Sequence, residues 1–398
     1  MHIAIFAETF LPKWDGITNT LCHLLDHLAA RGHPAMVFAP EGAPSHYAAA
    51  TIRGLRGFRF PLYPELKLAL PPLAVSPELA DFQPDLVHLA SPVSLGLAGL
   101  RQARALGVPI VASYHTDVPG YATLYGLDLF REPLWKYFRW VHNQAALTLC
   151  PSRFTEAQLK AHGFERLRVW GRGVDSQRFT PAKRRDDWRS RLTGAQPGAP
   201  LLLYVGRLAA EKRVDWLRTV LANLPGTHLA VVGDGPLRSE LEKAFADLPV
   251  VFTGYLQGED LACAYAAADV FAFPSANETF GNVVLEAMAS GLPVIAPRSG
   301  GLIDHVQHGH NGLLFEAGQA PDLVAQTRRV VNDRELCRRL GASARAYAVT
   351  QSWERILDGL LEDYAAIVAQ HGALPALPAT RSWLPCRSLA RQEYRSHG

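Results

Sequence analysis

The residues best suited to chemistry are two glutamates, Glu278 and Glu286, which are separated by seven residues. Glu286 interrupts an apolar run, where a charged side chain is costly to bury unless something pairs with it. A helix that begins at Gly281 would direct free backbone N–H groups and the positive end of its dipole at a ligand, which suits a phosphate. Glu278 would then lie in the loop before the helix and Glu286 in its second turn, so both can face one ligand.

Two cations, Arg207 and Lys212, follow a predicted strand that ends at Gly206 and precede a helical pattern. Two cations at a strand-to-helix junction suit a diphosphate. Taken alone, they could equally be surface charges of a solvated turn. The segment that contains Glu278 and Glu286 favours the diphosphate.

Two positions in the first half of the chain are candidates for ligand contact. His115 ends a predicted strand whose carboxyl end should face the ligand, although a lone histidine is more often a packing residue. Gly16 follows Asp15 between the first predicted strand and the first predicted helix. A glycine there would let the backbone approach a phosphate or a sugar, and a structural turn explains it equally well.

Predicted strands and helices alternate along the chain, and the strands are nearly continuous apolar runs. This pattern is typical of parallel sheets that are covered by helices on both faces. Two such series predict an α/β fold of two Rossmann-like, doubly wound domains, with the ligand between the carboxyl ends of their strands. The predicted strands are 2–8, 35–40, 85–91, 109–117 and 147–152, then 201–207, 228–233, 250–256, 270–275, 293–297 and 312–315.

The predicted domains are 1–175 and 176–352, because 176–200 is charged, rich in Pro and Gly, and carries no strong period. Residues 353–370 have the apolar stripe of a further helix. Residues 371–398 contain three Pro and scattered Arg, and we expect a flexible tail.

Composition excludes several classes of protein. The net charge of +3 comes from residues 371–398, so the rest is balanced and lacks the basic excess of a nucleic-acid-binding protein. Five scattered Cys without metal-site spacing indicate reduced thiols in a cytoplasmic protein. No run approaches the ~20 apolar residues of a membrane-spanning helix, and the start of the chain reads as a buried strand rather than a signal peptide.

Metal-binding signatures are missing from the sequence. It contains no D-x-D pair for a metal-bound nucleotide sugar, no H-E-x-x-H and no P-loop. A nucleotide diphosphate would therefore have to be neutralised by Arg207, Lys212 and a helix N-terminus. We expect no metal and no cofactor, with the nucleotide sugar as a co-substrate.

The chain resembles the retaining GT-B glycosyltransferases of family 4 over about residues 1–350, together with the helix that follows. Several motifs in the right order make this signal specific. They are Gly173-Val174-Asp175, Gly206-Arg207 with Glu211-Lys212, Gly233-Asp234-Gly235-Pro236, and Glu278-x7-Glu286 with Phe280-Gly281 inside.

The resemblance implies roles for the site residues. Arg207 and Lys212 would hold the donor diphosphate, with Gly16 of the first loop near the phosphate and the acceptor. Glu286 would bind the ribose hydroxyls. It also implies that the helix at 353–370 crosses back to the first domain, whereas the alternative is a helix packed on the second.

The donor sugar would lie against Glu278, and His115 would approach it at the reacting centre. These two are the candidate catalytic residues. Backbone N–H groups would meet the sugar hydroxyls and the phosphate. The remaining donor-sugar residues are Phe280, Gly281, Asn282 and Val283.

Within this family the chain is most similar to bacterial GDP-mannose-dependent α-mannosyltransferases that act on lipid acceptors, and next to sulfoquinovosyl and glucuronosyl diacylglycerol synthases. The implied function is transfer of a hexose, with mannose favoured, to an acceptor hydroxyl of a glycolipid or diacylglycerol-type lipid. The alternatives are a UDP-sugar-dependent transferase that acts on a soluble or polysaccharide acceptor, a nucleotide-sugar epimerase, and a non-catalytic binding subunit. Neither the acceptor nor the oligomeric state follows from the sequence.

Membrane contact is a further expectation. Two segments of the first domain, 58–63 and 135–140, mix aromatic and basic residues, which suits an anionic interface. Buried aromatic side chains are the alternative. We therefore expect a cytoplasmic protein, peripheral on the inner face of the plasma membrane if the acceptor is a lipid.

Overall fold

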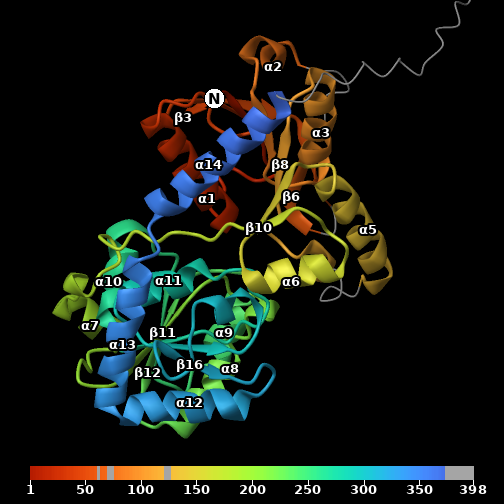
Figure 1. Cartoon of the computed structure of the whole chain (residues 1–398). Helices are drawn as coiled ribbons and strands as arrows, with labels where there is room; N and C mark the ends of the chain where they lie inside the picture. Colours follow the sequence, from red (N-terminus) through yellow and green to blue (C-terminus); the bar gives the residue numbers. More distant parts are fainter. Residues whose placement is uncertain (61–62, 70–75, 121–126, 373–398) are drawn as a thin grey trace, which may run out of the picture.

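The computed structural model describes residues 1–60, 63–69, 76–120 and 127–372, which form two α/β domains (Figure 1). The first domain has an eight-stranded sheet in the order β10-β9-β8-β7-β1-β2-β4-β3, and only the β3–β4 pair is antiparallel. A separate antiparallel pair is formed by β5 (Gly57–Phe60) and β6 (Tyr63–Ala69). The sheet strands are β1 (Ile3–Phe6), β2 (Ala35–Pro40), β3 (His46–Tyr47), β4 (Ala50–Leu55), β7 (Leu86–Leu89), β8 (Ile110–Ser113), β9 (Leu147–Cys150) and β10 (Leu167–Val169).

Both faces of this sheet are covered, because alternate residues of β1 lie in different cores. Ile3 and Ile5 pack with the leucines of α1, whereas Ala4 and Phe6 pack with α3. The helix α1 begins where Asp15 accepts hydrogen bonds from the N–H groups of Ile17 and Thr18. The helices of the domain are α1 (Gly16–Ala30), α2 (Pro77–Phe82), α3 (Ser94–Leu106), η1 (Asp128–Phe130), α5 (Arg131–His142) and α6 (Arg153–Ala161).

The second domain has a six-stranded parallel sheet in the order β13-β12-β11-β14-β15-β16. Its strands are β11 (Leu201–Val205), β12 (His228–Val232), β13 (Val250–Gly254), β14 (Val270–Ala272), β15 (Val294–Pro297) and β16 (Gly312–Phe315). Its helices are η3 (Ala210–Lys212), α8 (Trp216–Asn223), α9 (Arg238–Ala244), α10 (Gly258–Ala267), α11 (Asn282–Ala289), η4 (Gly300–Asp304), α12 (Ala320–Asn332) and α13 (Arg334–Val349).

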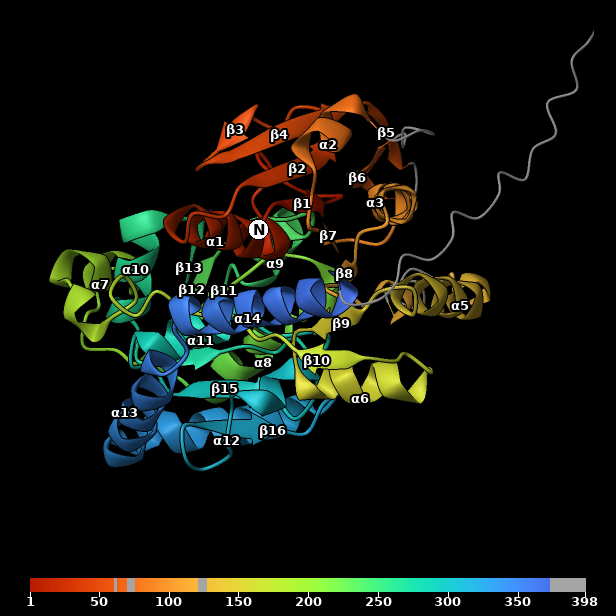
Figure 2. The ribbon, with the colours of Figure 1, turned by 45° about the horizontal axis from the view of Figure 1, so that its top comes forward.

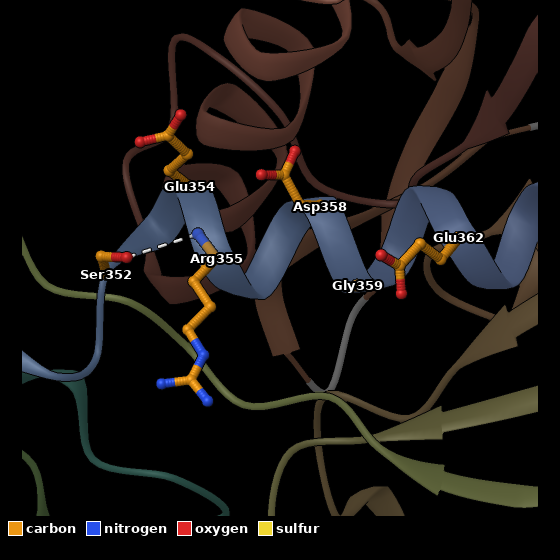
Figure 3. Close-up of a pocket in the computed structure, with 6 residues that line it drawn as sticks. All are labelled: Ser352, Glu354, Arg355, Asp358, Gly359 and Glu362. Atoms are coloured by element: carbon orange, nitrogen blue, oxygen red, sulfur yellow. Dashed lines mark hydrogen bonds between the residues drawn. The ribbon is translucent and has the colours of Figure 1, made fainter.

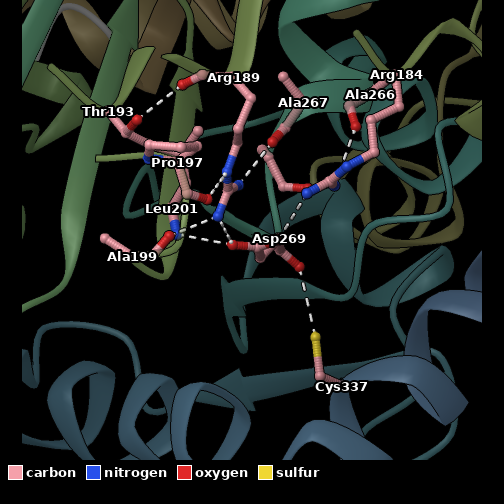
Figure 4. Close-up of polar contacts among 11 residues, drawn as sticks. Arg184, Arg189, Thr193, Pro197, Ala199, Leu201, Ala266, Ala267, Asp269 and Cys337 are labelled. Carbon is pink, nitrogen blue, oxygen red and sulfur yellow. Dashed lines mark hydrogen bonds and ion pairs between the residues drawn. The ribbon is translucent and has the colours of Figure 1, made fainter. Parts of the chain in front are cut away.

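The connection between the sheets is anchored to the second domain. It contains η2 (Pro181–Lys183) and α7 (Asp186–Leu192), and Arg189 of α7 is buried. Its guanidinium donates to the carboxylate of Asp269 at 2.7 Å and to the carbonyl of Ala267 at 2.7 Å (Figure 4). The same carboxylate accepts the N–H of Leu201, so one arginine ties α7 to the first strand of the second sheet.

A long helix, α14 (Trp353–Gly372), follows α13 and lies beside α1 of the first domain (Figures 1 and 2). Leu357, Leu360 and Tyr364 are buried in the same core as the leucines of α1, and the rings of Trp353 and His23 stack at 4.4 Å. A polar strip of the helix includes Asp358, which pairs with His27 and Arg31 at the end of α1. It borders a shallow hollow that is lined by Ser352, Glu354, Arg355, Asp358, Gly359 and Glu362 (Figure 3).

The structure confirms the predicted fold class and bears out the main strands. The predicted strand 109–117 is too long, because β8 ends at Ser113 and leaves His115 in the loop beyond it. The strands β3, β4, β5, β6 and β10 were not predicted. Within the described residues, no helix is long and apolar enough to cross a membrane. The predicted tail lies almost wholly outside the described residues.

We predict that Arg189→Met lowers the free energy of unfolding by roughly 2–3 kcal/mol, because it removes the guanidinium that donates to the Asp269 carboxylate and to buried carbonyls. Chemical denaturation monitored by circular dichroism measures this. Arg185→Met is the matched control, since Arg185 and its partner Asp187 are both more than half exposed. Equal effects of the two substitutions would contradict the anchoring role.

Candidate functional site

The start of α11 forms the centre of the candidate site. Its N-cap is Gly281, which adopts φ 88°, and a Cβ there would come within 2.4 Å of the Leu302 side chain. This position therefore requires glycine. No side chain caps the helix, so its first-turn N–H groups can meet a ligand. Phe280, before the cap, is buried.

The first domain meets α11 at this point. A Cβ on Gly16 would lie 3.4 Å from the side-chain nitrogen of Asn282. Gly16 begins α1 and Asn282 begins α11, so the positive ends of two helices face each other across the domain boundary. An anion between them would interact favourably with both.

Glu278 and Lys212 come together from two loops at the carboxyl ends of strands. They form an ion pair, and each side chain is only 16% exposed. The Ser275 hydroxyl donates a second hydrogen bond to the same carboxylate oxygen of Glu278, at 2.8 Å. The predicted diphosphate ligand Lys212 and the predicted sugar ligand Glu278 are therefore direct neighbours.

Arg207 lies in the same loop as Lys212, just beyond β11. Its carbonyl accepts a hydrogen bond from the Tyr204 hydroxyl at 3.0 Å, which fixes the backbone at the strand end. Gly233 lies against this loop, and a Cβ there would come within 2.0 Å of the Gly206 carbonyl oxygen. Close packing of the two loops thus explains Gly233.

Glu286 lies in the second turn of α11, as predicted, and is partly buried. The Tyr265 hydroxyl donates to its carboxylate at 2.9 Å. Burial raises the pKa of Glu286 to about 7, against the opposing effects of the Tyr265 hydrogen bond and the Arg178 charge. Near neutral pH, this carboxylate can therefore change charge in response to a ligand.

His115 contributes to the boundary from the first domain. The Thr279 hydroxyl donates to the His115 carbonyl at 3.1 Å, and the Arg172 guanidinium donates to the ring nitrogen Nδ1 at 2.7 Å. Arg172 also lies over the Phe280 ring, with its central carbon 5.9 Å from the ring centroid. Burial, followed by the charge of Arg172, lowers the pKa of His115 well below its ordinary value.

Three of the predicted site residues, Gly16, Asn282 and His115, thus lie at one boundary between the domains, where Gly16 meets Asn282 and His115 meets Thr279. Sequence reasoning missed Arg172, Thr279 and Tyr265. Arg172 directly precedes the Gly-Val-Asp motif, and Thr279 lies between the two glutamates, so both could have been noticed. Tyr265 is far from Glu286 in sequence, and no pattern in the sequence indicated their contact.

The predicted surface at 135–140 is divided between core and solvent, because only part of it is exposed. Trp135 and Phe138 of α5 are buried and pack with Tyr114 and Phe164, so these aromatics are not available to a membrane. The alternative of buried aromatics is correct for them. The side chains of 58–63 lie outside the described residues. In the part of the chain that is described, no group of three or more His, Cys, Asp or Glu is arranged to hold a metal ion.

Family models match both domains. The model of Glycosyltransferase Family 4 matches residues 14–178, and the model of Glycosyl transferases group 1 matches residues 199–333. The first match ends after β10, and the second begins just before β11. The two matches therefore follow the two sheets.

Curated relatives match nearly the whole chain. A GDP-mannose-dependent α-mannosyltransferase of Mycobacterium tuberculosis is 42% identical over 92% of this chain and 97% of its own length. The sulfoquinovosyl transferase SQD2 of Arabidopsis thaliana is 40% identical over 92% of this chain and 74% of its own. An α-monoglucosyldiacylglycerol synthase of Streptococcus pneumoniae is 28% identical over 74% of this chain and 71% of its own.

Solved structures show the same fold. A sucrose-phosphate synthase of Thermosynechococcus elongatus superposes with a TM-score of 0.77 at 23% identity, covering 93% of this chain and 99% of that one. Because family models match both domains and relatives share 40% identity or more, this chain belongs to glycosyltransferase family 4 and is a hexosyltransferase with the GT-B fold.

Proposed function

We propose that this enzyme transfers a hexose, with mannose favoured, from a GDP-sugar to a lipid hydroxyl with retention of configuration and without a metal. The observation that carries the proposal is the convergence of Lys212, Glu278 and the uncapped start of α11 at the boundary with Gly16. Similarity to a GDP-mannose-dependent enzyme over nearly its whole length supports the choice of donor.

The donor diphosphate would lie between the two helix starts and bind Arg207 and Lys212. These groups would stabilise the negative charge that develops on the leaving phosphate, which is most effective when the groups are positioned before the reaction begins. Lys212 would then be shared between the phosphate and Glu278. Glu286 would accept hydrogen bonds from the ribose hydroxyls at the second turn of the same helix.

The reaction would proceed on one face of the sugar, and the leaving phosphate would help to deprotonate the acceptor. Glu278 is the side chain that could instead act as a covalent nucleophile. Its carboxylate oxygen Oε1 is already engaged by both Lys212 and Ser275, which suits a group that orients the sugar hydroxyls. We therefore assign Glu278 to sugar binding rather than to nucleophilic attack.

The acceptor would be a diacylglycerol-type lipid at the inner face of the plasma membrane. One relative is a monoglucosyldiacylglycerol synthase, and the first domain exposes apolar side chains around η1 and α5. Leu129 is 85% exposed, Phe130 54% and Trp140 47%. Exposed Arg131, Lys136 and Arg139 on the same helix suit an anionic lipid surface.

Arg207→Ala and Glu278→Ala should each lower kcat/KM for GDP-mannose by at least about 100-fold, because each removes a group that stabilises the transition state. Formation of lipid-soluble labelled product on anionic vesicles that contain diacylglycerol measures this. Arg338→Ala is the control, since that side chain is 73% exposed. Unchanged turnover in both site variants, or a mannosyl adduct on Glu278 in mass spectrometry, would contradict the assignment. GDP release without a lipid product would contradict the acceptor alone.

Lowering the pH from 8 to 6 should weaken GDP binding by up to about tenfold, because protonation of Glu286, whose pKa is about 7, removes an acceptor for the ribose hydroxyls. The carboxylate is the binding form, so affinity is fully present above the pKa and lost below it. Isothermal titration calorimetry measures this. Glu286→Gln is the control, because any change of its GDP affinity with pH comes from ionisation of the GDP phosphate itself. An equal pH dependence of affinity in both proteins would rule out ribose binding by Glu286.

A further inference from the structure

The orientation of the His115 proton is determined by Arg172. The guanidinium nitrogen Nη2 donates to Nδ1 of His115 at 2.7 Å. An arginine side chain has only donors, so Nδ1 must be the acceptor and carries no proton. A neutral His115 must therefore carry its proton on Nε2.

His115 stays neutral across the physiological range. Burial lowers its pKa, and the charge of Arg172 acts in the same direction. Burial lowers the pKa of Arg172 only to about 9, so the guanidinium stays charged near pH 7. The pKa values of His88 and His142 are both lowered to about 3, so neither charges above pH 5.

The Nε2–H group of His115 has no hydrogen-bond partner among the described residues, although it is buried. Leaving a buried donor unpaired costs roughly 1–3 kcal/mol, so a ligand oxygen that accepts from this group would be stabilised by removing that cost. The surroundings are those of the candidate site. Thr279 holds the His115 carbonyl, and Phe280 lies beneath Arg172.

We propose that Arg172 is a positioning residue that fixes His115 as a neutral Nε2–H donor for an oxygen of the donor sugar. This inference rests on the proposed function for the identity of the ligand. It also excludes His115 as a general base, because the nitrogen with the free lone pair is occupied by Arg172. His115 therefore binds and orients rather than accepts a proton.

Arg172 is itself held rigidly enough for this task. It donates to the carbonyl of Trp170 at 2.7 Å and to that of Gly171 at 3.0 Å, and it lies 4.5 Å from the centre of the Trp170 ring. Histidine side chains in enzyme sites more often donate Nδ1–H to a carbonyl or carboxylate, which leaves Nε2 as a base. An arginine at this position reverses that arrangement. It also avoids a positive imidazolium beside a sugar that becomes positively charged in the transition state.

Nuclear magnetic resonance of the full-length, ¹⁵N-labelled protein tests this without any substrate. We expect two-bond ¹H–¹⁵N correlations of the His115 ring to show a protonated Nε2 and an unprotonated Nδ1 from pH 6 to 8. His115→Gln identifies the signal. A protonated Nδ1, or a ring that charges in this range, would overturn the inference even in an enzyme that uses GDP-mannose.

Removing the Arg172 side chain should leave the His115 ring without the donor that fixes its tautomer. In Arg172→Met we expect a changed tautomer or a His115 that titrates, and kcat for GDP-mannose lower by about 10–100-fold, as for other residues that orient a site group. Arg172→Lys should keep the tautomer, because lysine also only donates. Arg338→Met, which loses an ion pair to Glu335 at a largely exposed position, is the control. A wild-type tautomer in Arg172→Met would contradict the role of Arg172, whereas absence of turnover with wild-type protein would contradict only the proposed function.

Discussion

The site depends on the concentration of positive charge where the two sheets end. The starts of α1 and α11 meet across the domain boundary, and Lys212 lies at the carboxyl end of β11. Such a concentration is unfavourable unless negative charge balances it. The chain supplies part of this balance itself, since Asp15 caps α1 and Glu278 pairs with Lys212. The start of α11 has no side-chain cap, so its free N–H groups would stabilise an anionic ligand most strongly there.

A second group of contacts connects the site to the helix that joins the domains. The Tyr364 hydroxyl of α14 bonds to Nδ1 of His88 at 2.7 Å, and Nε2 of His88 bonds to the Ser113 hydroxyl at 2.6 Å. Ser113 is the last residue of β8, and His115 follows two residues later. This chain of hydrogen bonds therefore links the position of α14 to the strand end that precedes His115.

The sequence predicted the fold well because buried parallel strands are continuous apolar runs, as in 201–205 and 312–315. The prediction missed short strands such as β3 and β10, because a strand of two or three residues shows no hydrophobic period. The placement of Glu278, Gly281 and Glu286 was predictable because all three belong to one loop and one helix. The contact between Arg172 and His115 was not, because it joins residues 57 positions apart. Periodicity also could not separate an exposed aromatic face from the buried Trp135.

The central claim is that the side chains and helix ends of this chain bind the diphosphate by themselves. Calorimetric titration with GDP and with guanosine, in EDTA and again with Mg²⁺, tests it most directly. The account predicts that GDP binds at least about 100-fold more tightly than guanosine in EDTA, since each charged contact is worth about 1.5–3 kcal/mol. Mg²⁺ should then change the affinity little. Equal affinities of GDP and guanosine in EDTA, or tight binding of GDP only with Mg²⁺, would contradict it.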